Sequence, residues 1–264
     1  MKRLTASAVL MGLGLLLSCG GGGGEEAEKN GTLYADVWDS GSPDSLDGEA
    51  MLYADVMVDI SDLTLKINGA ELEKDVWDDP YPNFFFGGSV PKANPSSLSF
   101  TSSTLGNASA SVNIPGPTNI TSPQDSDTLP TGQDVVITWD AVSCDFYWVY
   151  VVVGFYDSNG GYLDWKIWSG YPTNATYTLP KDSLSYPGAA YAAVNFELYT
   201  VNGPVPTPGN KGNITGDLAG FFYGVNQGDS VEFYVGNPVK GHIPRLHRGP
   251  EKGEFLKSMK ELME

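Results

Sequence analysis

Residues 146–155 read Phe-Tyr-Trp-Val-Tyr-Val-Val-Val-Gly-Phe, and this run decides the fold class. Its aromatic and β-branched residues, with no charge among them, predict a central strand that is buried on both faces. The turn-forming residues 157–161 follow, and residues 162–168 predict the return strand of a hairpin. We therefore expect an all-β chain.

Short runs of the same kind occur on both sides of this segment, and each is bounded by turn residues. Upstream, strands are predicted at 33–38, 51–60, 63–67, 70–74, 84–90, 98–103 and 108–114. Around and after it, they are predicted at 135–139, 175–179, 191–201, 220–225 and 230–235. Asn68-Gly69 predicts a tight hairpin turn. Pro115-Gly116-Pro117 interrupts strand pairing, so we predict a domain boundary there.

The charge of the chain excludes two classes of partner. Its 264 residues carry a net charge of −17, with 15 Lys and Arg against 32 Asp and Glu. Residues 19–237 contain seven Lys, no Arg and 28 acidic residues, whereas the C-terminal tail is slightly basic. Such a body lacks the cations that neutralise nucleic-acid phosphates, and it is repelled by anionic lipid headgroups. We expect no nucleic-acid partner.

The N-terminus has the pattern of an export signal. Met1-Lys2-Arg3 is positively charged, and residues 4–17 are uncharged and too short to span a bilayer. The segment Leu16-Leu17-Ser18-Cys19 resembles the bacterial lipobox. That resemblance implies cleavage before Cys19, attachment of lipid to its sulfur, and a bacterial envelope protein held at the membrane by its N-terminus. An ordinary signal peptide with a chance Cys is the alternative.

The second half resembles the immunoglobulin-like and fibronectin type III sandwiches. The residues that carry this resemblance are Ile120–Pro123, Thr131-Gly132, Val135–Trp139, Tyr150–Val153 and Tyr191–Asn202. It implies that Trp139 is the core Trp of one strand and that Tyr150 lies on the next. The Cys…Trp…Cys arrangement of antibody domains does not occur in the sequence.

These observations predict two tandem immunoglobulin-like β-sandwiches after a lipoprotein signal and a flexible Gly-rich tether, with a short C-terminal helix. The predicted segments are 1–18 (signal), 19–30 (lipidated Cys and Gly/Glu tether), 31–115 (first sandwich), 117–237 (second sandwich) and 238–264 (basic tail). In the tail, Phe255, Leu256, Met259, Leu262 and Met263 form one apolar helical stripe. This helix either docks on the body, frays, or recruits a partner.

Acidic loops are the candidate cation ligands. Asp36, Asp39, Asp44 and Asp47 fall within one Gly/Ser/Pro-rich stretch, and flexible acidic loops can bind Ca²⁺. None of them has EF-hand spacing, and solvated acidic turns explain them equally well. We expect no other cofactor.

Catalytic motifs do not occur. The only His residues, His242 and His247, lie in the tail, so a Ser-His-Asp triad within the sandwiches is excluded. Cys144 has no His in the body to activate it, and we expect a small buried thiol, with an intermolecular disulfide as the alternative. Paired carboxylates could still hydrolyse a glycan. We expect a protein that is not an enzyme.

Aromatic residues offer a binding hypothesis. Trp148, Trp165, Trp168 and Tyr171 surround one hairpin, and exposed rings stack on sugars while carboxylates accept their hydroxyl protons. Alternation along 162–168 places Trp165 with Leu163 and Ile167, so we predict that Trp165 is in the core. Trp168 is then the predicted surface residue. The sequence thus predicts a non-catalytic binding or scaffold module of the cell envelope, whose protein or glycan partner it does not select.

Overall fold

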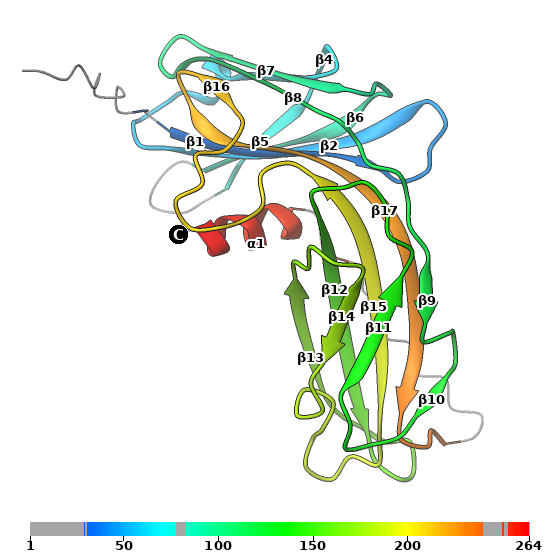
Figure 1. The fold of residues 1–264 in the computed structure, drawn as a ribbon. Helices are drawn as coiled ribbons and strands as arrows, with labels where there is room; N and C mark the ends of the chain where they lie inside the picture. The colour runs from blue at the N-terminus through cyan, green and yellow to red at the C-terminus, as the bar shows by residue number, and fades with distance from the viewer. Residues whose placement is uncertain (1–28, 30, 78–82, 240–249, 251–252, 264) are drawn as a thin grey trace, which may run out of the picture.

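The computed structural model describes residues 29, 31–77, 83–239, 250 and 253–263, and these residues form an L-shaped molecule (Figure 1). The upper limb contains the strands β1 (Gly31–Asp39), β2 (Ser45–Ala54), β3 (Thr64–Ile67), β4 (Ala70–Glu71), β5 (Glu73–Trp77), β6 (Asn83–Pro91), β7 (Ser96–Ser102), β8 (Gly106–Val112) and β16 (Thr215–Gly216). The lower limb contains β9 (Ile120–Ser122), β10 (Thr128–Leu129), β11 (Val135–Trp139), β12 (Phe146–Tyr156), β13 (Tyr162–Gly170), β14 (Thr176–Leu179) and β15 (Tyr191–Asn202). The strand β17 (Ala219–Val235) runs through both limbs, and the helices are the short 3-10 helix η1 (Ile60–Asp62) and α1 (Glu254–Met263).

Among the described residues, one nine-stranded sheet extends through the whole molecule. Its strands lie in the order β13-β12-β15-β17-β1-β2-β6-β5, and β10 pairs with the end of β17. A five-stranded sheet, β16-β8-β7-β3-β4, faces the upper part of this large sheet, and a three-stranded sheet, β14-β11-β9, faces the lower part. The prediction of an all-β, sandwich-like fold with a short C-terminal helix is confirmed.

Two apolar cores lie between these sheets. The upper core includes Leu33, Val37 and Phe100, and the lower core includes Trp139 and Phe196; all are at most 4% exposed. Each position on a strand faces the opposite side from its neighbour, so the same strands carry a second set of apolar residues on the other face of the large sheet. Along β12 both faces are covered, and every residue from Phe146 to Tyr156 is buried, as the sequence predicted.

Strand β17 connects the two cores. Its first part pairs in parallel with β1, and its second part pairs antiparallel with β15. A register shift between Glu197 and Tyr199 of β15 places a bulge in this pairing. The bulge reverses the alternation, so Phe222 joins the upper core and Phe233 joins the lower core from the same sheet face.

Several strand predictions differ in detail from the structure. Residues 220–225 and 230–235 were predicted as two strands, but both belong to β17. The predicted strand 51–60 ends at Ala54, and Met57 is 85% exposed. The predicted hairpin turn is confirmed: Asn68 and Gly69 have φ values of 51° and 81°, which a tight two-residue turn requires.

The predicted boundary at residues 115–117 falls in a segment, 113–119, without regular structure that leads from β8 to β9. The two sandwiches are nevertheless not two consecutive pieces of chain. Ile214, Leu218 and Phe222 belong to the upper core although they lie within 117–237. The shared sheet was not anticipated from the sequence.

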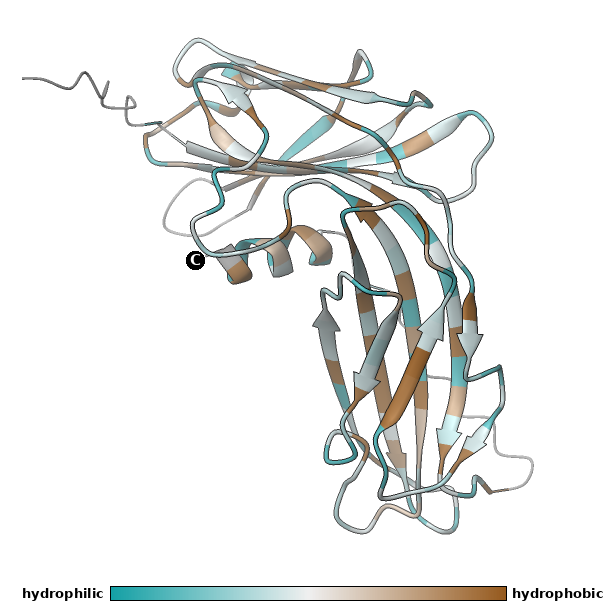
Figure 2. Cartoon of the chain, in the orientation of Figure 1, coloured by the Kyte–Doolittle hydropathy of each residue, from teal (hydrophilic) through white to brown (hydrophobic). Residues whose placement is uncertain are grey.

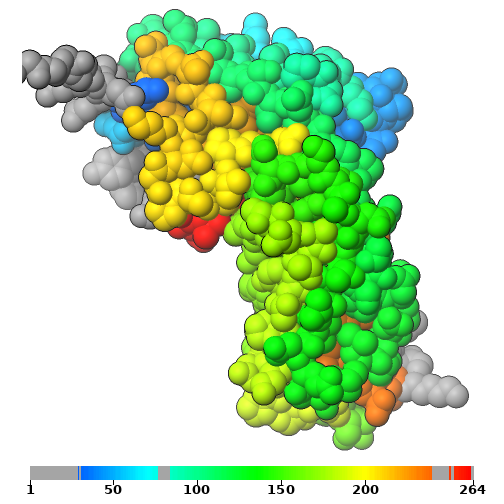
Figure 3. Space-filling view, viewed as in Figure 1, coloured from blue at the N-terminus to red at the C-terminus, as the bar shows by residue number. Residues whose placement is uncertain are grey.

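Helix α1 lies in the inner corner of the L, beneath the upper limb and beside the lower one (Figures 1 and 3). Figure 2 shows its apolar residues as brown segments among paler ones. Phe255, Leu256 and Met259 are each at most 1% exposed and pack on the face of the large sheet that the sandwich cores leave open. The tail helix is therefore docked. No helix in the described part of the chain has the length and apolarity needed to cross a membrane.

Candidate functional site

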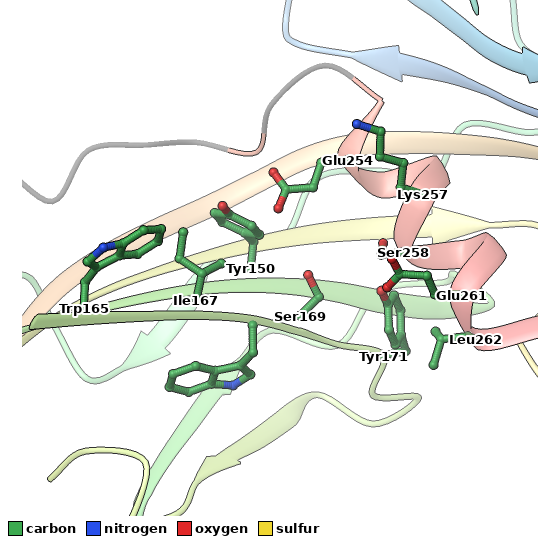
Figure 4. A pocket seen from close by; sticks show the side chains of 11 residues that line it. Tyr150, Trp165, Ile167, Ser169, Tyr171, Glu254, Lys257, Ser258, Glu261 and Leu262 are labelled. Atoms are coloured by element: carbon green, nitrogen blue, oxygen red, sulfur yellow. The ribbon is translucent and has the colours of Figure 1, made fainter. Parts of the chain in front are cut away.

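A cleft of about 740 Å³ lies between the large sheet and helix α1. Figure 4 shows its two walls, with the sheet residues on one side and the helix residues on the other. The sheet contributes Tyr150, Trp165, Ile167, Trp168, Ser169 and Tyr171, and the helix contributes Glu254, Lys257, Ser258, Glu261 and Leu262. The cleft thus combines aromatic rings with hydroxyl, carboxylate and ammonium groups, as small-ligand sites commonly do.

The alternation of β13 builds the sheet wall. In the pairing with β12, Ile167 lies opposite Val152 and Ser169 lies opposite Tyr150, so these residues face the same side as Trp165. Strand β13 is the edge strand of the sheet, which leaves Trp165 48% exposed. Tyr171 follows the end of the strand. Burial raises the pKa of Tyr171 to about 12, so its hydroxyl stays protonated at neutral pH.

The helix wall is held in place at both ends. The backbone N–H of Gly253 donates to Glu49 Oε2 of β2 at 2.8 Å, immediately before the helix begins. Further along, Lys260 Nζ lies 4.7 Å from the centroid of the Tyr53 ring, within the range of a cation–π contact. Between these points the buried residues of α1 contact the sheet, and four polar residues of the helix line the cleft.

The assignment of Trp165 and Trp168 from the sequence is wrong. Trp168 lies opposite Val151 of β12 and is half-buried against the lower core, on the same face as Lys166. Lys166 Nζ lies 5.0 Å from the centroid of the Phe155 ring, which belongs to that core. Trp165 is the exposed residue, because the face predicted to be the core side is the outer face. Trp168 is also among the residues that line the cleft, although its strand position faces the lower core, and a ligand contact by it stays a prediction.

The structure does not bring the four candidate Ca²⁺ ligands together. Asp39 Oδ2 forms an ion pair with Lys92 Nζ at 2.9 Å, and Asp47 Oδ2 accepts a hydrogen bond from Ser40 Oγ at 3.3 Å. Asp44 is exposed, and Asp36 is fully buried. Within the described ranges, no three acidic, His or Cys side chains lie close enough together to hold a metal ion.

Asp36 has an unusual environment for a carboxylate. It lies opposite Glu49 on β2 and Tyr223 on β17, and it is 0% exposed. Burial raises its pKa well above the usual range, and the charge of Glu49 raises it further. The nearby Trp38 N–H lowers this pKa somewhat, although neither group has a hydrogen bond of good geometry to any described residue. A carboxylate closed off in this way is not positioned to act on a ligand in the cleft.

Cys144 is half-buried beside the lower core. Burial raises the pKa of its thiol, which lowers the thiolate fraction at neutral pH. The sequence predicted a buried thiol, whereas Cys144 is only half-buried, and its lack of a nucleophilic role stays a prediction. Cys19, His242 and His247 lie outside the described residues.

Sequence reasoning selected the hairpin but missed the helical wall. Trp148, Trp165, Trp168 and Tyr171 were the aromatic candidates, and three of them line the cleft. The five lining residues of α1 were not identified. The apolar stripe of the tail was the available signal, because it showed that the helix had a buried face without showing where that face would dock.

No family model matches the sequence, and no curated protein matches it. Among solved structures, the chain is similar to the fibronectin(III)-like modules of Clostridium thermocellum CbhA. The sequence identity is 13%, the TM-score is 0.23, and the match covers 80% of this chain and 94% of that chain. A similarity of this size transfers no function from one protein to the other.

Proposed function

We propose that this chain is a lipid-anchored, non-catalytic binding module of the bacterial cell envelope, and that it binds a neutral glycan in the cleft between β13 and α1. The observation that carries the proposal is the position of Trp165. Trp165 is 48% exposed and lines a cleft that also presents Ser169, Ser258 and Glu261. A ring for stacking beside hydroxyl and carboxylate groups is the combination that sugar binding requires.

The charge of the protein favours a neutral ligand. The chain has a net charge of −17, so a polyanionic glycan would be repelled over its whole surface. The cleft itself has one Lys and two Glu residues, which suit hydrogen bonds to hydroxyl groups rather than binding of an anion. β-1,4-Linked glucose units are suitable probes, because their equatorial hydroxyls leave flat apolar faces for stacking.

The pKa of Tyr171, which lines the cleft, does not suit its hydroxyl to acid–base catalysis at neutral pH. Burial raises the pKa of Tyr171 to about 12, and burial likewise raises the pKa of Cys144, which moves both groups away from neutral pH. Asp36, whose pKa is also raised, is fully buried. A general acid or base needs a pKa near the working pH and access to its substrate.

The glycan proposal is tested by calorimetric titration of the protein with cellobiose. Trp165→Ala should weaken binding at least about fivefold, because a stacking ring contributes on the order of 1 kcal/mol or more. Tyr162→Ala is the matched control, since Tyr162 is a 56% exposed aromatic residue of the same strand that does not line the cleft. Absence of binding by the unmodified protein, or equal loss in both variants, would overturn the proposal.

The anchoring proposal rests on the lipobox-like residues and has its own test. Metabolic labelling with palmitate in a bacterial host should modify the unaltered chain and fail with Cys19→Ala. Cys144→Ala is the matched control and should be labelled normally, because it removes the other Cys of the chain. Labelling that survives Cys19→Ala would overturn lipid attachment at this residue.

A further inference from the structure

The aromatic surface of the cleft continues beneath helix α1. Four side chains form a strip across the outer face of the large sheet, from Tyr150 through Trp148 and Tyr199 to Trp38. The ring centroids of Tyr150 and Trp148 are 6.0 Å apart, those of Trp148 and Tyr199 are 4.7 Å apart, and those of Tyr199 and Trp38 are 5.3 Å apart. The strip begins in the cleft and crosses from the lower sandwich to the upper one.

Helix α1 covers the far half of this strip. The ring of Phe255 lies 5.0 Å from Trp148 and 5.9 Å from Trp38, measured between centroids, and 5.3 Å from the neighbouring Tyr223. Leu256 and Met259 are fully buried against the same surface. A ligand in the cleft therefore meets the helix before it reaches Trp148 or Trp38.

The covered surface is not an apolar one alone. The indole nitrogen of Trp148 and the hydroxyl of Tyr223 are buried without a hydrogen-bond partner of good geometry among the described residues. The helix presents Phe255, Leu256 and Met259 here, and these side chains cannot donate or accept. Buried polar atoms without partners weaken an interface. A ligand rich in hydroxyl groups would supply the donors and acceptors that the helix lacks.

The helix is also poorly stable by itself. It has ten residues, which is shorter than the length at which isolated helices persist in water, so its structure depends on this contact. A ligand that competes for this surface would therefore unfold the helix rather than move it as a rigid body.

We propose that α1 occupies one half of a longer glycan-binding surface: a short neutral β-linked glycan binds in the cleft beside the helix, and a long one displaces the helix and lies along the whole strip. This rests on the proposed function, since it takes the cleft as the site where the same class of ligand enters. The helix then makes the binding affinity depend on the length of the glycan.

Titration of the full chain with cellobiose and with cellohexaose tests the proposal. Phe255→Ala, which removes an aromatic contact of the helix with the strip, should tighten cellohexaose binding by at least about tenfold and leave cellobiose binding within about twofold. Ile137→Ala is the control for general destabilisation, because Ile137 is fully buried in the lower core away from α1. It should change neither affinity.

Hydrogen exchange of the unmodified chain provides a second measurement that needs no variant. Saturation with cellohexaose should speed amide exchange in residues 254–263, and saturation with cellobiose should not. The proposal that the helix is displaced is wrong if cellohexaose slows exchange in residues 254–263, or if Phe255→Ala binds both sugars like the unmodified chain. In either case, binding of cellobiose would still support the proposed function. If neither sugar binds any variant, both proposals fail.

Discussion

The ring centroids of Trp148 on β12 and Phe255 on α1 lie 5.0 Å apart, with their planes at 58°. Phe255 also contacts Trp38 on β1 and Tyr223 on β17. One side chain of the C-terminal helix therefore contacts strands of both limbs.

Removing that ring should loosen the helix. We expect Phe255→Ala to lower the free energy of unfolding by about 3 kcal/mol, as for other buried Phe residues, in urea denaturation followed by circular dichroism. Leu262 lies on the same helix and is 38% exposed. Leu262→Ala should therefore lower the free energy of unfolding by no more than about 0.5 kcal/mol. Equal effects of the two substitutions would contradict the observed docking.

The buried carboxylate of Asp36 should make stability fall as pH rises. Its pKa is raised in the folded state by burial and by Glu49, so the folded protein holds this proton more tightly than the unfolded chain. The stabilisation is complete below the unfolded value near 3.8 and is lost as pH rises through the higher folded value.

Asp36→Asn, which mimics the protonated acid, should therefore stabilise the protein at pH 7 and have little effect near pH 3. Urea denaturation at a series of pH values measures this. Asp44→Asn is the matched control, because Asp44 is an exposed residue of the loop before β2. A stabilisation that did not depend on pH would show that charge burial is not the cause.

The contribution of Asp62 to stability should depend on pH in the opposite direction. Its carboxylate accepts hydrogen bonds from Ser102 Oγ at 2.6 Å, from Ser103 Oγ at 2.6 Å and N–H at 2.8 Å, and from the Thr104 N–H at 3.1 Å. These bonds, led by the Ser102 hydroxyl, hold its pKa well below the usual range. The stabilisation is present above the unfolded value of 3.8 and is lost as pH falls through the folded value.

Asp62→Asn should accordingly destabilise the protein at pH 7, and the difference from the unmodified chain should narrow below pH 3. Urea denaturation at the same series of pH values measures this difference in the free energy of unfolding. A destabilisation that persists unchanged at low pH would mean that the side chain acts through its shape rather than its charge.

The two Trp residues of β13 should separate stability from binding. Trp168→Ala should lower the free energy of unfolding by about 2 kcal/mol, because the ring packs against the lower core. Trp165→Ala should change it by less than about 1 kcal/mol, because the ring is 48% exposed. Thermal denaturation compares the pair, and the reverse order would restore the assignment made from the sequence.

Local patterns were sufficient to place most strands. Residues 146–155 and 135–139 were recognised from their composition, and Asn68-Gly69 from the conformation that its turn demands. The parallel pairing of β1 with β17 could not be found in this way, because Leu33 and Gly220 are far apart in the sequence and no local pattern relates them. Alternation along β13 separated its two faces correctly. It could not say which face was inner, because α1 and the lower core make both faces partly apolar.

The single strand β17 has a mechanical consequence for the whole molecule. An elbow joined only by residues 113–119 could bend freely, whereas backbone pairing on both sides of the bulge fixes the angle between the limbs. Removal of either limb would also leave half of β17 without the strands that pair with it. We expect differential scanning calorimetry to record one melting transition for both limbs, and two well-separated transitions would contradict this coupling.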